Sequence, residues 1–261
     1  EKIRLTGGEP LISAKLNDVL PALSVLDYKD ISLTTNGQLL ENKIRFLKEC
    51  GIKRLNISLD TLDPSRFYQI TRGGLLQTTL NGINKALEND IRVKINMVPI
   101  IGMNEDDIVP LLDYCLERNM ELRYIELMQM GHLSERKEFV KKFIPIEKIF
   151  SKIREKYSFE PAHAPQDSTA NRFKIKNKGF FGAIANDSSP FCKNCNRLRF
   201  SSTGEIHGCL SSTEKFSIRE LLTLPEETAK EKLKPILAAA LATKQSNSFD
   251  GSSLLMKTVG G

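Results

Sequence analysis

The sequence predicts an α/β fold with a parallel sheet, because short apolar or β-branched segments alternate with helical patterns along its first half. Five such segments recur, at residues 3–6, 31–35, 55–59, 93–100 and 122–128. Each of the first four is followed by a helical pattern. Strands that alternate with helices in this way pair in parallel through right-handed crossovers. A chain of 261 residues is long enough for a barrel-sized domain and a small appendage.

The helical patterns repeat apolar residues at the spacing of one buried helix face. These residues are Leu16, Val19, Leu20 and Leu23 in the first pattern, and Leu80, Ile83 and Leu87 in a later one. Asn104 is a candidate N-cap for a further helix that includes Ile108. Glycine and polar residues, together with one methionine, stand where the predicted strands end: Gly7, Gly8, Thr34, Ser58 and Met128. In parallel α/β architectures that edge carries the chemistry.

The second half of the chain has a different pattern, which is lysine-rich and less periodic from about Gly131. We therefore predict a domain boundary there, with residues 1–140 forming a barrel domain and 141–261 a C-terminal region. In this region we expect a helix over 145–157, a polar loop over 161–170 and a hairpin over 173–184. A second hairpin is expected over 198–206, turning at Thr203-Gly204, followed by helix and then by a mobile tail over 245–261.

The charge and hydropathy of the chain limit its partners and its location. The net charge of +6 and the pI near 9.0 favour nucleotides, nucleic acid or membrane surfaces without choosing among them. No stretch approaches the roughly twenty apolar residues of a membrane span, and no signal-peptide pattern opens the chain. We therefore expect a cytoplasmic protein. Because residues 2–6 already form a strand-like pattern, we also expect that the sequence begins inside a folded element and that an upstream segment is missing.

Three of the five cysteines lie close together in sequence, at Cys192, Cys195 and Cys209. The odd total and this distribution favour metal ligation in a reducing compartment over a disulfide framework. A CxxC turn places two sulfurs on one metal, and a hairpin can return a third. Cys50 and Cys115 instead continue apolar helix faces, so we expect both thiols to be buried and inert.

Two kinds of metal site fit these cysteines. A structural zinc site closes with four protein ligands, so zinc needs His207 to complete a Cys3His site. An iron–sulfur cluster held by three cysteines leaves one iron open to a nitrogen or oxygen of a substrate. The spacing alone slightly favours zinc.

Basic residues suggest where an anion binds. Arg197 and Arg199 point the same way if their segment is extended, and they either bind a phosphate chain or flank the metal site as solvated surface residues. A second set, made of Arg4, Lys94 and Arg123, lies in three predicted strands, where a barrel points the side chains inward together. Inward charges are costly unless a ligand or counter-ion meets them. For each residue singly, a surface salt bridge is the more common explanation.

Two turns at strand ends offer ligand-binding groups. GGEP at 7–10 has backbone that a ligand can approach closely, and TTNG at 34–37 has hydroxyls for a ribose or a carboxylate. Each segment taken alone is better explained as an ordinary turn.

The order of these motifs resembles that of the bacterial GTP 3′,8-cyclase family (molybdenum cofactor biosynthesis protein A), which belongs to the radical S-adenosylmethionine (SAM) enzymes. The resemblance rests on IRLTGGEP at 3–10, LTTNG at 33–37, LNISLD at 55–60, RYIELM at 123–128, FCKNCNRLR at 191–199 and the final Gly260-Gly261. The first motif is shared by many radical SAM enzymes. The CxxCNRLR segment with its distal cysteine and the double-glycine end are specific to this family.

The resemblance implies a fold and cofactors. The fold is an incomplete TIM-like (β/α)6 radical SAM barrel that lacks its N-terminal unit, plus a C-terminal α+β region that carries a second iron–sulfur cluster. The cofactors are two [4Fe–4S] clusters and SAM. The first cluster is bound by a CxxxCxxC motif, which the sequence lacks. We therefore expect the chain as given to be inactive.

The resemblance also implies residue roles. SAM contacts are expected from Gly8, Ser58 and Met128, with Gly7 and Glu9 shaping the same pocket. GTP contacts are expected from Arg4, Thr34, Lys94, Arg197 and Arg199. Cys192, Cys195 and Cys209 hold the second cluster, whose open iron meets the guanine. Catalytic assistance is expected from Arg123, near the SAM site, and from Gly260 and Gly261.

The implied reaction converts GTP to (8S)-3′,8-cyclo-7,8-dihydroguanosine 5′-triphosphate, the first step of molybdenum-cofactor (molybdopterin) biosynthesis. The implied partners are an external electron donor and the downstream cyclic pyranopterin monophosphate synthase, and a homodimer is possible; neither nucleic acid nor a membrane is expected. Two alternatives remain open at this point. One is another radical SAM enzyme with an auxiliary cluster, such as a peptide-modifying maturase. The other is a basic, zinc-stabilised nucleic-acid-binding protein.

Overall fold

The computed structural model describes residues 2–164, 168–190, 192, 195–245, 249, 251 and 252. The chain forms two compact units. The first comprises residues 1–127 and 142–184, and the second comprises residues 128–141 and 185–261. Within the described part of the chain, no helix has the length and apolar character needed to cross a membrane.

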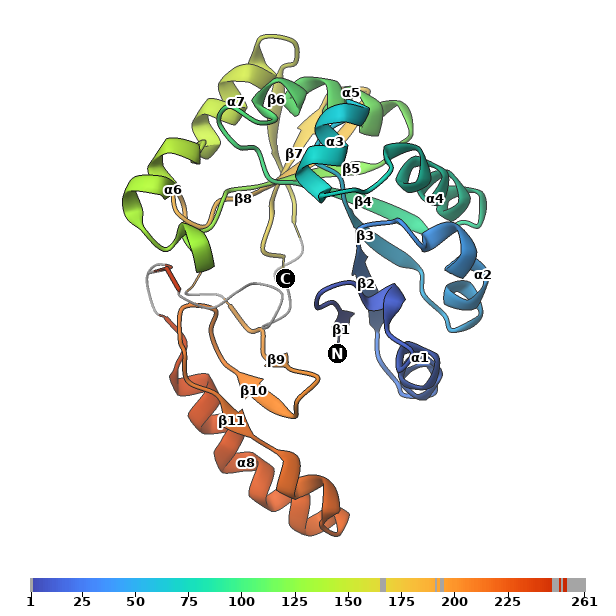
Figure 1. Ribbon diagram of the computed structural model, residues 1–261, viewed down its shortest axis with the longest axis vertical. Coiled ribbons are helices and arrows are strands. Elements are labelled where there is room, and N and C mark those ends of the chain that lie inside the picture. The colour runs from blue at the N-terminus through green and yellow to red at the C-terminus, as the bar shows by residue number, and fades with distance from the viewer. Residues whose placement is uncertain are drawn as a thin grey trace. The chain divides into compact units, whose positions relative to one another are not determined.

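The first unit is built on an eight-stranded sheet (Figure 1). Five strands follow one another in parallel: β1 (Lys2–Leu5), β2 (Asp30–Thr35), β3 (Arg54–Ser58), β4 (Arg92–Met97) and β5 (Glu121–Ile125). The sheet continues through β8 (Gly179–Ile184), parallel to β5, and then antiparallel through β7 (Asn171–Ile175) and β6 (Phe159–Ala162). The predicted parallel order of the first five strands is therefore confirmed.

Helices connect the strands of this sheet, most of them along its outer side (Figure 1). They are α1 (Leu16–Ser24), α2 (Leu40–Glu49), α3 (Pro64–Thr71), α4 (Leu76–Glu88), α5 (Ile108–Glu117) and α7 (Ile146–Arg154). Leu16, Leu20 and Ile83 are buried as predicted, whereas Val19 is 42% exposed. The sequence analysis missed α3, although Asp63 caps it through the Arg66 N–H and Pro64 opens its first turn.

Asn104 departs from its predicted role as a helix cap. It precedes the 3₁₀ helix Glu105–Asp107, but its side chain makes no capping hydrogen bond. Its Oδ1 accepts from the Ile100 N–H at 2.7 Å, and its Nδ2 donates to the carbonyls of Asp60 at 3.0 Å and Val98 at 3.1 Å. The amide therefore fastens the loops after β3 and β4 to each other.

The two faces of the sheet differ in polarity, because side chains alternate along each strand. The face beneath the helices is apolar and buried, with Leu33, Leu55, Ile57, Ile95, Leu122, Tyr124 and Phe181. The opposite face carries polar and charged residues in neighbouring strands: Arg4, Ser32, Thr34, Arg54, Asn56, Lys94, Asn96, Glu121, Arg123 and Arg172. Parallel sheets are usually apolar on both faces. The polar face therefore indicates a binding surface.

The compact units do not follow the predicted division at residues 140 and 141. Residues 142–184 belong to the first unit. The reason is strand pairing, because β8 adds to the parallel sheet beside β5 and brings β7 and β6 with it. The predicted hairpin over 173–184 is present as the antiparallel pair of β7 and β8.

The second unit contains a small antiparallel sheet of β9 (Arg199–Phe200), β10 (Glu205–His207) and β11 (Phe216–Ser217). The predicted turn at Thr203-Gly204 in the hairpin over 198–206 is confirmed, since Gly204 adopts a φ of 74° between β9 and β10. The helix α8 (Glu226–Ala242) packs against β10 and β11, and most of α6 (Arg136–Lys142) also belongs to this unit.

The predicted mobile tail is partly wrong. Ser252 forms a β-bridge with Met130, in which the Gly131 N–H donates to the Ser252 carbonyl at 3.0 Å. Residues 246–248, 250 and 253–261 lie outside the described residues.

Replacing Gly82 by alanine is expected to destabilise the first unit, because an added Cβ would lie 2.9 Å from the Leu40 Cβ and 3.0 Å from the Gly37 carbonyl oxygen. Overpacking of this kind costs about 1–3 kcal/mol, although alanine is otherwise the better helix former. Urea unfolding of G82A should show the loss, whereas Asn81→Ala on the exposed side of α4 should not. An unchanged midpoint for G82A would contradict the close packing of α2 against α4.

Candidate active site

The polar face of the first unit brings predicted site residues into one row. In the parallel register Thr34 lies beside Asn56, Asn56 beside Lys94, and Lys94 beside Glu121. Arg123 stands two residues further along β5, beside Asn96. Arg4 is on the same face at the edge strand β1, beside Ser32. The sequence prediction that Arg4, Lys94 and Arg123 share one face is therefore confirmed.

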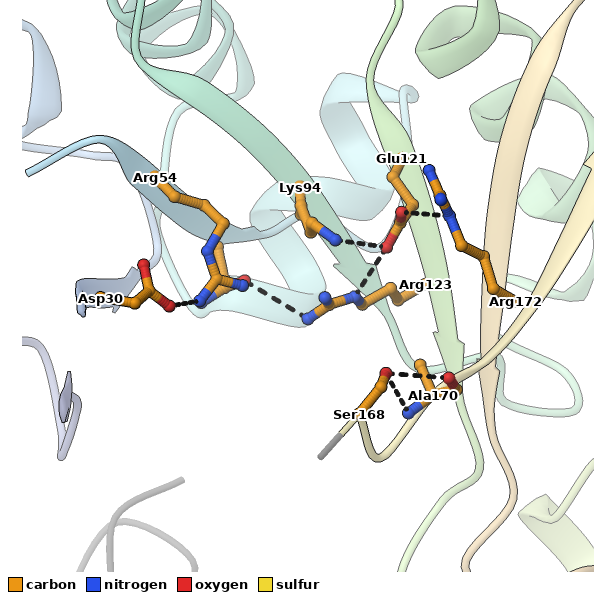
Figure 2. A network of polar contacts seen from close by, with 9 residues as sticks. Asp30, Arg54, Lys94, Glu121, Arg123, Ser168, Ala170 and Arg172 are labelled. Atoms are coloured by element: carbon orange, nitrogen blue, oxygen red, sulfur yellow. Dashed lines mark hydrogen bonds and ion pairs between the residues drawn. The ribbon is translucent and has the colours of Figure 1, made fainter. Parts of the chain in front are cut away.

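Three basic residues of this face, Lys94, Arg123 and Arg172, converge on Glu121, which the sequence analysis missed (Figure 2). One carboxylate oxygen accepts from Lys94 Nζ at 2.7 Å and from Arg123 Nε at 3.2 Å. The other oxygen accepts from Arg172 Nε at 3.1 Å. Arg123 also donates to Asn56 Oδ1 at 3.4 Å, and Asn56 donates to Thr34 Oγ1 at 3.4 Å. A separate pair joins Arg54 to Asp30.

The charges in this network alter one another's pKa values. Burial, together with the positive charge of Arg123, lowers the pKa of Lys94 to about 8, although the hydrogen bond from Lys94 to Glu121 opposes the shift. Burial alone would raise the pKa of Glu121, but Lys94 and Arg123 bring it below its ordinary value. A lysine that loses its proton near neutral pH makes anion binding sensitive to pH.

The turn after β1 has the open backbone that the sequence predicts. Gly7 adopts a φ of 121°, and a Cβ at Gly7 or Gly8 would meet no atom within 4 Å. The next residue, Glu9, is held by neighbouring groups. Its carboxylate accepts hydrogen bonds from Thr35 Oγ1 and from the Asn36 N–H, both at 2.7 Å. Glu9 thus ties the end of β1 to the end of β2. The open backbone at Gly7 and Gly8 fits the close approach of a ligand.

A pocket of about 340 Å³ lies at the carboxyl ends of β2 and β3. It is lined by Asn36, Gln38, Ser58, Asp60, Phe67, Ile70, Thr71, Gly73 and Gly74. Burial raises the pKa of Asp60 to about 6, although the hydrogen bond from the Val98 N–H opposes the shift. The exposed hydroxyl of Ser58 therefore stands beside a weakly acidic carboxyl group.

Asn96 has a buried side-chain oxygen with no hydrogen-bond partner in the described part of the chain. It lies on the polar face, beside Ser58 on one side and Arg123 on the other. Buried polar atoms are nearly always satisfied, so an orphaned oxygen here fits a site that receives a donor from a ligand. The orphaned oxygen and the open backbone at Gly7 and Gly8 are two places where the first unit has room or a free acceptor for a ligand.

The second unit brings the three clustered cysteines together. Cys192, Cys195 and Cys209 line a single pocket of about 50 Å³. Arg197 and Arg199 also line this pocket, so the structure brings both predicted arginines to the three cysteines. Met128, which the resemblance assigns to SAM, belongs to this unit and lines the same pocket, whereas Gly8 and Ser58 belong to the first unit.

Lys244, at the end of α8, is a further member of this pocket that the sequence analysis missed. Its Nζ lies 3.7 Å from Cys195 Sγ and donates to the carbonyls of Arg197 at 2.6 Å and Gly208 at 3.3 Å. Gly208 packs so closely on α8 that an added Cβ would lie 1.7 Å from the Ala240 carbonyl oxygen. The end of α8 therefore fixes both segments that carry the cysteines.

The donor set fits an iron–sulfur cluster. Thiolates are the ligands of such clusters, and burial alone would raise the pKa of Cys195, but the Arg197 N–H and the nearby charges of Arg197 and Lys244 lower it. His207 is buried in β10, and among the described residues it is not one of those that line the pocket. No group of three His, Cys, Asp or Glu side chains in the described part of the chain is arranged to hold a single metal ion.

Two protein-family models match the chain. The model of the Radical SAM superfamily matches residues 1–115, and that of Molybdenum Cofactor Synthesis C matches residues 120–249. A GTP 3′,8-cyclase of Listeria monocytogenes is 38% identical over 252 residues, which is 95% of this chain and 74% of that protein. This chain belongs to the GTP 3′,8-cyclase family.

A second relative agrees with this assignment. A GTP 3′,8-cyclase of Sulfurovum sp. is 40% identical to this family member over 223 residues, which is 84% of the chain and 67% of that protein. A crystal structure of Streptococcus suis SuiB bound to S-adenosylmethionine superposes with a TM-score of 0.60 and 16% identity, covering 84% of this chain and 52% of that one. That likeness shows the fold alone, an α/β fold with a parallel sheet of radical SAM type.

The family assignment decides between the alternatives that the sequence left open. The resemblance to GTP 3′,8-cyclases is confirmed, and neither a peptide-modifying maturase nor a zinc-stabilised nucleic-acid-binding protein is supported. The roles of individual residues stay predictions, and Gly260 and Gly261 lie outside the described residues.

In the metal-free protein, iodoacetamide is expected to modify Cys192, Cys195 and Cys209 and to leave Cys50 and Cys115 intact. The first three thiols are half-buried, whereas Cys50 is 7% exposed and Cys115 is 0% exposed. Burial also raises the pKa of Cys50 and of Cys115, so little reactive thiolate forms at either. Peptide mass spectrometry should locate the modified residues, with urea-unfolded protein as the control in which all five react. Equal modification of the five in the folded protein would contradict the structure.

Proposed function

We propose that this family member converts GTP to (8S)-3′,8-cyclo-7,8-dihydroguanosine 5′-triphosphate, the first step of molybdenum-cofactor biosynthesis. The observation that carries the proposal is the similarity to GTP 3′,8-cyclases over 95% of the chain. The polar face supports it, because Lys94, Arg123 and Arg172 meet a single carboxylate there. This excess of positive charge suits a triphosphate.

Five residues are proposed to bind GTP: Arg4, Thr34 and Lys94 in the first unit, and Arg197 and Arg199 in the second. The two arginines suit phosphate oxygens, because a guanidinium group offers paired donors in a fixed plane. Burial, together with the charge of Arg197, lowers the pKa of Arg199 to about 10, although the Cys195 and Cys209 sulfurs oppose the shift. Arg199 therefore stays charged at neutral pH.

SAM is proposed to contact Gly8, Ser58 and Met128, with Gly7 and Glu9 shaping its pocket. Gly7 and Gly8 leave room for close approach, and Glu9 holds the ends of β1 and β2 together. Arg123 is proposed to assist catalysis from its buried position beside Glu121 and Asn56. When bound, SAM and the clusters supply the reducing electron and the radical that activates the ribose.

Cys192, Cys195 and Cys209 are proposed to hold the second [4Fe–4S] cluster, and Gly260 and Gly261 to assist catalysis. Residues 1–140 are proposed to supply the SAM site and part of the GTP site, and residues 141–261 to supply the second cluster. The sequence holds no CxxxCxxC motif for a first cluster, so these 261 residues alone are proposed to be inactive. The proposed partners are an external electron donor and the downstream cyclic pyranopterin monophosphate synthase. A homodimer and a cytoplasmic location are also proposed.

Anaerobic reconstitution with iron and sulfide is expected to load one [4Fe–4S] cluster onto the chain. Cys209→Ser should lose most of the iron and acid-labile sulfide, because it removes one of the three ligands. Cys115→Ser should retain both, since that thiol is fully buried on α5 and outside the pocket. Metal and sulfide analysis with the visible absorbance of the cluster provides the measurement. Stoichiometric zinc without sulfide would overturn the cluster assignment.

Arg197→Ala and Arg199→Ala are each expected to weaken GTP binding by roughly 10-fold or more, because a hydrogen bond to a charged group contributes about 1.5–3 kcal/mol. Isothermal titration with GTP provides the measurement. Lys230→Ala serves as the matched control, because Lys230 pairs with Glu226 and Glu227 on the exposed side of α8. Unchanged affinity in both arginine variants would count against the GTP site.

A further inference from the structure

Glu121 has no role in the proposed function, although it makes more ionic contacts than any other carboxylate drawn in Figure 2. Its side chain is 12% exposed at the first position of β5. Lys94 reaches it from β4, Arg123 from two residues further along β5, and Arg172 from β7. Three strands therefore meet through one carboxylate group.

The geometry fixes the carboxylate before any ligand binds. Lys94 and Arg123 share one oxygen of Glu121, and Arg172 takes the other. Arg172 is itself held, because its guanidinium lies 3.7 Å from the centroid of the Phe180 ring. Both oxygens of Glu121 are therefore engaged, and rotation of the carboxylate would break an ion pair.

The same contacts restrain the two basic residues that the proposed function uses. Arg123 is held at both ends, by Glu121 at Nε and by Asn56 at Nη1. Lys94 would otherwise face the positive charges of Arg123 and Arg54, both of which disfavour its protonated form. Asp30 pairs with Arg54, which leaves Glu121 as the carboxylate that contacts Lys94 in this network.

We propose that Glu121 is a positioning residue of the nucleotide site, which holds Lys94 in place for GTP and Arg123 in place for catalysis while leaving the group of charges net positive. The inference rests on the proposed function for the identity of the anion. The three cations and one carboxylate sum to +2, which still attracts a polyphosphate. Glu121 therefore lowers the total charge of the site but fixes the charges that remain.

If Glu121 acts through its charge on Lys94, its loss changes how binding depends on pH, which a merely structural role would not do. Removing the negative charge of Glu121 raises the positive charge of the site, so at pH 6.5 Glu121→Gln should bind a polyphosphate with unchanged or higher affinity. Removing it also takes away a carboxylate that favours protonated Lys94, against Arg54 and Arg123, which disfavour it. Binding should then weaken at a lower pH than in the wild type.

The experiment measures the affinity of the full 261-residue chain for GTP and for inorganic tripolyphosphate between pH 6.5 and 9. Wild-type affinity is expected to fall as pH rises through about 8, where Lys94 loses its proton. In E121Q the midpoint of this fall should move down by roughly one pH unit or more. In Lys94→Met the fall in affinity should be absent over this pH range. Adding E121Q to K94M should leave the affinity equally independent of pH.

Two further variants make the measurement specific. Asp113→Asn is the matched control, because it removes a carboxylate that pairs with Lys156 and Tyr157 on the helical side of the sheet, and its profile should follow the wild type. Glu121→Asp keeps the charge on a shorter side chain and should give an intermediate shift. It carries the test if circular dichroism shows that E121Q does not fold.

Nuclear magnetic resonance of the Lys94 side chain in the ligand-free chain provides a readout that needs no nucleotide. Its titration should move to lower pH in E121Q, or in E121D if E121Q is unfolded. Superimposed titrations of the wild type and the folded variant would overturn the inference, whatever the affinity for GTP. If the chain binds tripolyphosphate with the expected pH shift but binds GTP no more tightly than tripolyphosphate, the role of Glu121 is supported and the proposed substrate is overturned.

Discussion

The first unit depends on how charged side chains are neutralised on one face of a parallel sheet. Burying a charge without a partner is costly, and parallel sheets usually avoid the cost by being apolar on both faces. Here Asp30 pairs with Arg54, and Glu121 pairs with Lys94, Arg123 and Arg172. Basic groups therefore outnumber carboxylates four to two in this network. A bound anion would balance this excess, so the same constraint would be a source of affinity for an anion.

The second unit meets a similar constraint with different anions. Arg197, Arg199 and Lys244 line a pocket in which the candidate negative groups are the sulfurs of Cys192, Cys195 and Cys209. The dependence is mutual, because the charges of Arg197 and Lys244 lower the pKa of Cys195, and the sulfurs oppose the lowering of the pKa of Arg199. Thiolates suited to iron and guanidinium groups suited to phosphate thus stabilise each other.

Much of the fold follows from sequence because its signals are local. The βα alternation predicted the parallel order β1 to β5, and the apolar spacing of Leu16, Leu20 and Ile83 predicted buried helix faces. The failures occur where tertiary pairing decides. Residues 142–184 lack βα periodicity, yet β8 joins the parallel sheet beside β5. Asn104 has the chemistry of a cap, but nearby loop carbonyls and the Ile100 N–H compete successfully for its amide.

The site was only partly predictable for the same reason. Lys94 and Arg123 stand out in sequence as basic residues within apolar strands, but Glu121 precedes the predicted strand and has the pattern of a solvated residue. Its role depends on the register that pairs Lys94 with Glu121 across β4 and β5, and a shift of one residue would place the carboxylate on the opposite face. Lys244 is similar, since only the packing of Gly208 on α8 brings it to Cys195. Sequence therefore reveals the basic groups that are proposed to meet a substrate, whereas the groups that contact and hold them become visible only through the register and packing of the fold.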